Sequence, residues 1–253
     1  MNLELLERYG PRMLDGLSVT VALVVASLVF GALLSLPIVL ARVEGGRLAR
    51  AATGAYMQFF RGTPVLAQLF LVYYGAGQFR VGLEEAGMWW LFRDAWFCAL
   101  LAFTLNTAAY QAQILSGAIA NVPRGQWEAA RALGLHTPVI YWRVVLPQAL
   151  MVALRPYGNE VVLMIKASAV ASVVTVFDLM GVTRLAFSRS FDFEVYFWAA
   201  ALYLLLTEGV RVVWGAMERR LTRHLAPVGA RAAGDTLKVT ARTRVTAAGA
   251  GHR

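Results

Sequence analysis

The chain has 253 residues, of which 58% are hydrophobic and only 15% are charged, and its mean hydropathy is +0.57. A soluble domain carries about a quarter charged residues, so the composition excludes an ordinary soluble protein and predicts an all-α protein that crosses a membrane several times. The net charge of +9 does not predict nucleic-acid binding, because positive charge on cytoplasmic loops and in the basic C-terminal tail accounts for it. The single cysteine, Cys98, excludes an intrachain disulfide and a cysteine-cluster metal site.

Apolar runs of about 20 residues, long enough to cross a bilayer as a helix, occur about five times in one membrane domain that covers residues 17–225. A short N-terminal segment, 1–16, precedes this domain. A polar and basic tail, 226–253, follows it and is expected to be disordered. The predicted spans cover residues 17–41, 56–77, 95–119, 149–172 and 195–214.

The placement of arginine predicts the orientation of these spans. Arginines concentrate in the linker after the first span, in the loop 120–147 and after the last span, whereas the other loops carry fewer. Basic residues favour the cytoplasmic side of a membrane. We therefore expect the N-terminus outside, the loop 120–147 inside and the C-terminus in the cytoplasm.

The loop 120–147 carries its own helix signals. Pro123 suits the start of a helix, and Gly134 suits the left-handed position that follows a helix end. Thr137 and Pro138 predict an N-cap and first turn of a second short helix. Pro147 predicts a kink or the entry into the next apolar run. The pattern indicates a helix, a tight turn and a second helix between two spans.

The same loop resembles the EAA loop of ATP-binding-cassette (ABC) importer permeases, although the family usually has isoleucine where this chain has Val144. In that family the loop is cytoplasmic and docks into a cleft on the ATPase subunit. An ordinary amphipathic connecting helix is the alternative. The resemblance assigns ATPase coupling to Glu128, Ala129, Ala130, Gly134, Leu146 and Pro147.

Polar residues interrupt the second span at Arg61-Gly62-Thr63-Pro64, and Gln68 follows one turn later. A glycine and a proline break a helix, and broken helices at membrane depth are tolerated where they line a cavity. These residues are therefore candidates for a substrate path; alternatively, Arg61 extends to the cytoplasmic interface. The run FRGTPVLAQLFLVYYG resembles the polar amino acid subgroup of these permeases.

Asn106 and Tyr110 in the third span share one helix face and are further path candidates, or they hydrogen-bond a neighbouring helix. Their run, NTAAYQAQI, resembles the same subgroup, which usually has glutamate where this chain has Gln113. In the fourth span, Asn159 and Glu160 are candidates as well. An acid at this depth could attract a cationic substrate, or it could pair with Lys166 or Arg155.

The stretch from Pro156 to Gly181, PYGNEVVLMIKASAVASVVTVFDLMG, resembles permeases for histidine, lysine, arginine, ornithine and opines. The chain has no G-x-x-x-x-G-K-[ST] phosphate loop, no H-E-x-x-H and no G-x-S-x-G motif. We therefore expect no enzymatic function, no cofactor and no metal in this chain. The resemblance implies that ATP and Mg²⁺ are bound by a separate ATPase.

The resemblance covers about residues 17–225 and implies a type I ABC importer permease in the bacterial inner membrane. Its implied partners are an ATPase dimer, a second permease subunit (identical or a paralogue), an extracytoplasmic amino-acid-binding protein and membrane lipid. Two alternatives stay open. An ion-gradient-driven secondary amino acid transporter predicts an internal repeat, and a membrane anchor would need no polar groups at membrane depth.

Overall fold

The computed structural model describes residues 3–222, and the tail predicted from residue 226 onward lies outside the described residues. Every element within the described range is a helix, which confirms the predicted all-α fold. The chain divides into two units, Met1–Trp214 and Gly215–Arg253. Of the second unit the structure describes only the end of the last helix. The cavities and contacts described below belong to the first unit.

The first helix, α1 (Leu3–Val43), is longer than the predicted span 17–41 and contains most of the segment 1–16. It extends because its N-terminal part has its own packing partners. Tyr9 and Met13, one helical turn apart, are both buried, against residues of two later helices, α10 and α11. Burial of these two side chains stabilises the helical turns that precede the predicted membrane span.

The second predicted span, 56–77, is divided between two helices. Helix α2 (Arg47–Gly62) ends with Thr63 in an extended conformation, and α3 (Val65–Gln78) starts after Pro64. The cause is local, because a proline disfavours the helical conformation of the residue before it. The following polar loop holds two short helices, α4 (Arg80–Glu85) and α5 (Trp89–Phe92).

Helix α6 (Ala95–Ala120) is the central helix of the first unit and contains no charged residue. Asp94 caps its N-terminus by accepting a hydrogen bond of 3.0 Å from the Trp96 N–H. Many of its buried residues are alanines, and its most extensive contact is with α1. At that contact Gly31 of α1 lies so close to Thr107 that an added Cβ would be 2.4 Å from Thr107 Cγ2.

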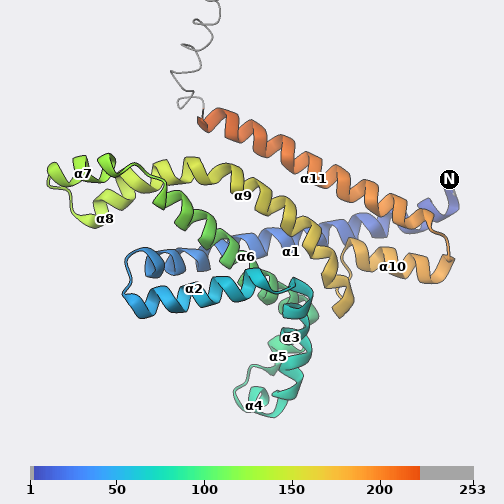
Figure 1. Ribbon diagram of the computed structural model, residues 1–253. Coiled ribbons are helices and arrows are strands. Elements are labelled where there is room, and N and C mark those ends of the chain that lie inside the picture. Colours follow the sequence, from blue (N-terminus) through green and yellow to red (C-terminus); the bar gives the residue numbers. More distant parts are fainter. Residues whose placement is uncertain (1–2, 223–253) are drawn as a thin grey trace, which may run out of the picture. The chain divides into compact units, whose positions relative to one another are not determined.

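The predicted helix–turn–helix of the loop 120–147 is present as α7 (Arg124–Ala132) and α8 (Thr137–Ile140), which lie together at one end of α9 (Figure 1). Gly134 adopts a left-handed φ of +73° in the turn, as predicted. The second cap differs by one residue from the prediction, because His136 is the N-cap and Thr137 is already helical. Five π-helical residues, Tyr141–Val145 (η1), join α8 to α9.

Helix α9 (Leu146–Ser168) continues into a 3-10 helix, Ala169–Val174 (η2). The connecting segment predicted around 178–194 is mostly helical, as α10 (Leu179–Ser190). Asp178 is its N-cap and accepts a hydrogen bond of 2.8 Å from the Gly181 N–H, a cap that the sequence reading did not use. The last helix, α11, covers Glu194–Leu221.

Three helical stretches in the described part of the chain are long and apolar enough to cross a membrane: Glu7–Val43, Thr137–Val174 and Glu194–Leu221. Helix α6 lies where the span 95–119 is predicted and has 26 residues, but its polar side chains lower its hydropathy. The break at Thr63 and Pro64 keeps the remaining predicted span from forming one long helix.

Candidate substrate cavity and coupling surface

A cavity of about 290 Å³ lies where the break between α2 and α3 meets α6 and α9. Its polar lining groups come from three separate stretches of the chain, the break after α2, helix α6 and helix α9, and include one ionisable acid, Glu160. The remaining lining is apolar. The lining residues are Thr63, Pro64, Val65, Asn106, Tyr110, Glu160, Leu163, Met164 and Ala167.

The side-chain amide of Gln68 holds the helix break together. Its nitrogen is 2.9 Å from the backbone oxygen of Phe60, 3.1 Å from that of Thr63 and 2.8 Å from Thr63 Oγ1. The backbone oxygens at the end of α2 have no partner in the next helical turn, because the helix stops there. Gln68 therefore replaces the missing helical hydrogen bonds and is buried behind the cavity wall.

Asn106 joins this arrangement from α6. Its side-chain nitrogen donates to the Phe60 oxygen at 2.9 Å and to Gln68 Oε1 at 3.0 Å. Asn106 thus links two helices through its amide, as one of its two predicted roles requires, and it also lines the cavity, while its substrate role stays a prediction. The Tyr56 hydroxyl adds a second link, donating to the backbone oxygen of Leu105 at 2.7 Å.

Glu160 lies on the α9 wall of the cavity with 5% of its surface exposed. The hydroxyl of Thr107 donates a hydrogen bond of 2.8 Å to its Oε1. Gln111 in turn donates to Thr107 Oγ1 at 3.2 Å and to the backbone oxygen of Leu28 at 3.1 Å. The acid is thus the end of a buried chain of hydrogen bonds that crosses from α1 through α6 to α9.

Arg61 is exposed at the end of α2, and its guanidinium carbon lies 5.4 Å from the centre of the Tyr110 ring. This distance is typical of a cation–π contact. Because Tyr110 lines the cavity, the Arg61 guanidinium lies beside the same cavity as the carboxyl group of Glu160, an arrangement suited to the two charged groups of an amino acid.

The predicted path residues fall into two groups. Thr63, Pro64, Asn106, Tyr110 and Glu160 line the cavity, while Arg61, Gly62, Gln68 and Asn159 do not. Asn159 is exposed, because it lies on a different face of α9 from its buried neighbour Glu160.

The alternative partners considered for Glu160, Lys166 and Arg155, are both exposed, whereas its hydrogen-bond donor is Thr107. Sequence reasoning missed Thr107 and Gln111. The available signal was their position one and five residues after Asn106 in an uncharged helix.

The predicted coupling residues are divided between an exposed surface and its support. Glu128 and Ala129 are exposed on α7, whereas Ala130 is buried with Ile140 and Val145 in one core cluster. Leu146 and Pro147 begin α9. Leu133 at the tip was not predicted, yet 79% of its surface is exposed next to the left-handed Gly134. An exposed leucine at a tight turn is suited to insertion into a partner.

Tyr141 ties the base of this loop to the membrane domain. Its hydroxyl donates a hydrogen bond to Glu44 in the linker between α1 and α2. Its ring lies edge-on to the ring of Trp127, with the centroids 5.1 Å apart. Helix α7, the π-helix and the end of α1 are thereby joined through one side chain.

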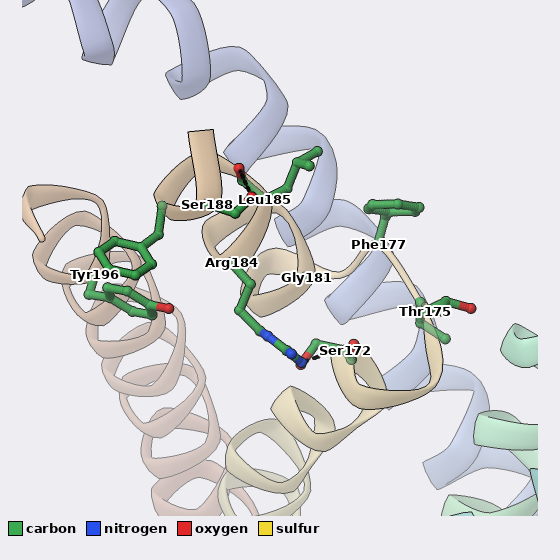
Figure 2. A pocket seen from close by; sticks show the side chains of 10 residues that line it. Ser172, Thr175, Phe177, Gly181, Arg184, Leu185, Ser188 and Tyr196 are labelled. Atoms are coloured by element: carbon green, nitrogen blue, oxygen red, sulfur yellow. Dashed lines mark hydrogen bonds between the residues drawn. The ribbon is translucent and has the colours of Figure 1, made fainter. Parts of the chain in front are cut away.

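A second cavity, of about 460 Å³, lies between η2, α10 and the start of α11. Figure 2 shows Arg184 extending from α10 toward Ser172, whose backbone oxygen is 3.4 Å from the guanidinium. Phe177 and Tyr196 provide aromatic walls. The residues that line this cavity include Arg184 but no acidic side chain.

A membrane domain with a broken helix, a buried carboxylate beside an internal cavity and an exposed helix–turn–helix at one end is the arrangement of a transport permease driven by another subunit. The match to a family model supports this class. Residues 27–223 match the family described as binding-protein-dependent transport system inner membrane component. The chain belongs to this family and is a transport component rather than an enzyme.

The chain is similar to curated permeases for amino acids and opines. It is 41% identical to the nopaline transport system permease protein NocM of Agrobacterium fabrum, over 82% of this chain and 86% of that protein. It is 38% identical to the octopine transport system permease protein OccM of Rhizobium meliloti, over 77% and 79%. It is 34% identical to the arginine ABC transporter permease protein ArtM of Haemophilus influenzae, over 85% and 94%.

Solved structures show the same fold. The chain superposes on an amino acid ABC transporter, crystallised with histidines, with a TM-score of 0.76 and 31% identity, covering 87% of this chain and 99% of the other. The MetNI methionine ABC transporter in an inward-facing conformation gives a TM-score of 0.65 at 20% identity, covering 83% and 96%. That second likeness concerns the fold alone.

These findings confirm the predicted ABC importer permease of the polar amino acid type and its place in the inner membrane. They also decide between the alternatives. A secondary transporter driven by an ion gradient and a membrane anchor without transport function are both excluded by the family.

Proposed function

We propose that this permease carries amino acids with a cationic side chain, such as arginine or an opine, and that Glu160 binds the cationic group in the cavity. The observation that supports this most is the position of the Glu160 carboxylate, which is 5% exposed and lines the cavity wall. Its hydrogen-bond donor is the neutral hydroxyl of Thr107. An acid at membrane depth is costly unless a cation or a transport function compensates.

Arg61 completes the proposed recognition. Its guanidinium, placed over Tyr110, is suited to the α-carboxylate of a substrate, while Glu160 takes the cationic end. The names of three relatives, which give nopaline, octopine and arginine as their substrates, support this class. Arginine carries the guanidinium that a buried carboxylate binds well.

We also propose the subunit composition of the transport complex, of which the family description names only the dependence on a binding protein. Two permease subunits, identical or paralogous, stand on an ATPase dimer, and an extracytoplasmic binding protein delivers the amino acid. ATP and Mg²⁺ are held by the ATPase. The N-terminus of this chain is outside and the C-terminus is in the cytoplasm, in line with the arginine-rich linkers near α2 and α7.

The α7–α8 unit is the proposed link to the ATPase. Its exposed face includes Glu128 and Leu133, and its buried side is anchored by Ala130 in the core of the membrane domain. When ATP closes the ATPase dimer, this packed unit moves as a rigid body and carries the start of α9 with it. Because Glu160 lies on α9, the movement reaches the cavity wall.

The test is uptake of labelled arginine into proteoliposomes that contain the full complex, comparing Glu160→Gln with the wild type. The matched control is Glu208→Gln, which removes an exposed acid of α11 that pairs with Arg211 at 2.9 Å. We expect Glu160→Gln to lower arginine uptake about tenfold or more, because a charge-assisted hydrogen bond contributes about 1.5–3 kcal/mol. Co-purification of the ATPase checks that the variant still assembles.

Competition by unlabelled amino acids shows whether a variant has lost its preference for cationic substrates or has lost transport altogether. We expect Glu160→Gln to spare the uptake of a neutral polar amino acid such as glutamine if the complex carries it. Arginine uptake at the wild-type rate in Glu160→Gln, with the ATPase bound, would contradict the role of Glu160.

A further inference from the structure

A third cavity lies apart from the substrate cavity, beside the base of the coupling loop. It measures about 160 Å³ and lies between the C-terminal end of α1, the C-terminal end of α6 and the π-helix. Leu36 and Leu40 form one wall, Ile119 another, and Tyr141, Trp142 and Leu146 the third. We refer to it as the π-helix groove.

The size and lining of the π-helix groove select an apolar guest. Its lining side chains are aliphatic or aromatic, and the one hydroxyl among them, that of Tyr141, is already bonded to Glu44. A water molecule in the groove would lack the two to four polar partners that it needs. Apolar cavities of about 150 Å³ stay dry and accept small hydrocarbon guests.

The open side of the groove continues into an exposed apolar stripe along α1 that consists of Leu33, Leu36 and Leu40. The α1 and π-helix walls of the groove belong to stretches of membrane-spanning length and hydropathy, so we expect lipid to surround this stripe. Because Leu36 and Leu40 belong to both the stripe and the groove, a hydrocarbon chain that lies along α1 can enter the groove sideways.

The π-helix beside the groove has the chemistry of a membrane interface. Trp142 is 69% exposed, and Arg143, next to it in the π-helix, is also exposed. Tryptophan beside basic residues is typical of the level of lipid headgroups, and arginine there attracts anionic phosphate. The groove suited to hydrocarbon is thus next in sequence to an exposed basic residue suited to phosphate.

We propose that the π-helix groove binds one acyl chain of an anionic membrane phospholipid, with the headgroup phosphate at Arg143. The bound chain packs against Tyr141, Trp142 and Leu146, which join the α7–α8 unit to α9. π-Helical segments often occur at functional sites. The lipid therefore supports the joint through which motion of the coupling loop reaches the cavity.

The experiment uses the complete permease–ATPase complex in nanodiscs that contain a phosphatidylglycerol with a photoactivatable group near its acyl end. Labelled peptides are identified by mass spectrometry. The test variant is Leu40→Trp, which places a ring at the mouth of the groove, and the matched control is Leu33→Trp, which lies on the same exposed stripe outside the groove. Both positions are exposed, so both variants are expected to fold.

We expect wild-type labelling at the π-helix and the end of α6, a reduction of about tenfold in Leu40→Trp, and no reduction in Leu33→Trp. Arg143→Gln is expected to remove the preference for phosphatidylglycerol over phosphatidylcholine. Equal labelling in both tryptophan variants would overturn the proposal. Labelling by a photoactivatable free fatty acid but not by the phospholipid, or protection of the groove by a protein chain, would overturn it as well.

Discussion

The hydroxyl of Thr107 lies 2.8 Å from Oε1 of Glu160, and its direction is determined by a third residue. Because the side-chain amide of Gln111 donates to Thr107 Oγ1 at 3.2 Å, the hydroxyl hydrogen is left to point at the carboxylate. Thr107 thus orients the acid that we propose as the cation-binding group. All three side chains are buried, so water does not substitute for any of them.

Thr107→Val removes this hydroxyl with little change in volume. We expect the KM for arginine uptake to rise about tenfold, because a hydrogen bond to a charged group contributes about 1.5–3 kcal/mol. Thr107→Ser keeps the hydroxyl and is expected to restore the wild-type KM. The two are compared by initial uptake rates in proteoliposomes; equal KM values for the valine and serine variants would show that the hydroxyl plays no part.

Gly31→Ala tests the close approach of α1 to α6. An added Cβ would lie 2.4 Å from Thr107 Cγ2 and 3.1 Å from the Gln111 side-chain nitrogen, so the helices have to separate. We expect a loss of about 1–3 kcal/mol in the free energy of unfolding. Gly117→Ala in α6 is the control, since a Cβ there meets no atom within 4 Å. Denaturation of the two purified variants measures the difference, and equal stability would contradict the close packing.

Gln68→Leu tests the arrangement at the helix break. The substitution leaves the backbone oxygen of Thr63 without its side-chain donor and removes the acceptor of Asn106. Loss of one partner of a buried polar group costs about 1–3 kcal/mol. Gln78→Leu, at the exposed end of α3, is expected to stay within about 0.5 kcal/mol of the wild type. Chemical denaturation of both proteins provides the comparison.

Gly134→Ala tests the turn of the coupling loop. A Cβ at Gly134 meets no atom within 4 Å, so the cost is confined to the left-handed φ of +73° and is about 1–2 kcal/mol. We expect the complex to assemble but its ATPase activity to respond less to the loaded binding protein. Gly125→Ala in α7 also meets open space and has no positive φ, so it should preserve coupling. Full stimulation in both variants would argue against a role for the turn geometry.

Asp178→Asn tests how the buried acid at the N-cap of α10 makes stability depend on pH. Burial raises the pKa of Asp178 to about 6 from 3.8, although the Gly181 N–H and the Tyr203 hydroxyl oppose the shift. Between these values the folded protein holds a proton that the unfolded chain has released. The contribution of Asp178 to stability is therefore largest below about pH 4 and falls, on the order of 3 kcal/mol, as the pH rises through about 6.

Asparagine keeps the cap acceptor and cannot titrate, so Asp178→Asn should flatten this part of the stability profile. Asp94→Asn, at the exposed cap of α6, should retain the slope. Unfolding midpoints measured from pH 4 to pH 7 decide the matter, and an unchanged slope in Asp178→Asn would place the titrating group elsewhere.

The coupling loop could be predicted from sequence because its determinants are local. Pro123 is placed directly before a helix, Gly134 takes a left-handed turn, and Pro64 ends α2, each through the conformational limits of its own backbone. The membrane class likewise followed from composition, since long apolar helices need no tertiary partner to be recognised.

The cavity depended on tertiary structure, because its contacts join residues that are far apart in the chain. Asn106 meets Gln68 across 38 residues and Thr107 meets Glu160 across 53. Helical periodicity placed Asn106 and Tyr110 on one face but could not say that Thr107 reaches the acid or that Asn159 turns away. Which side chains converge was decided by the packing of α1, α6 and α9, where Gly31 allows an approach that no local pattern encodes.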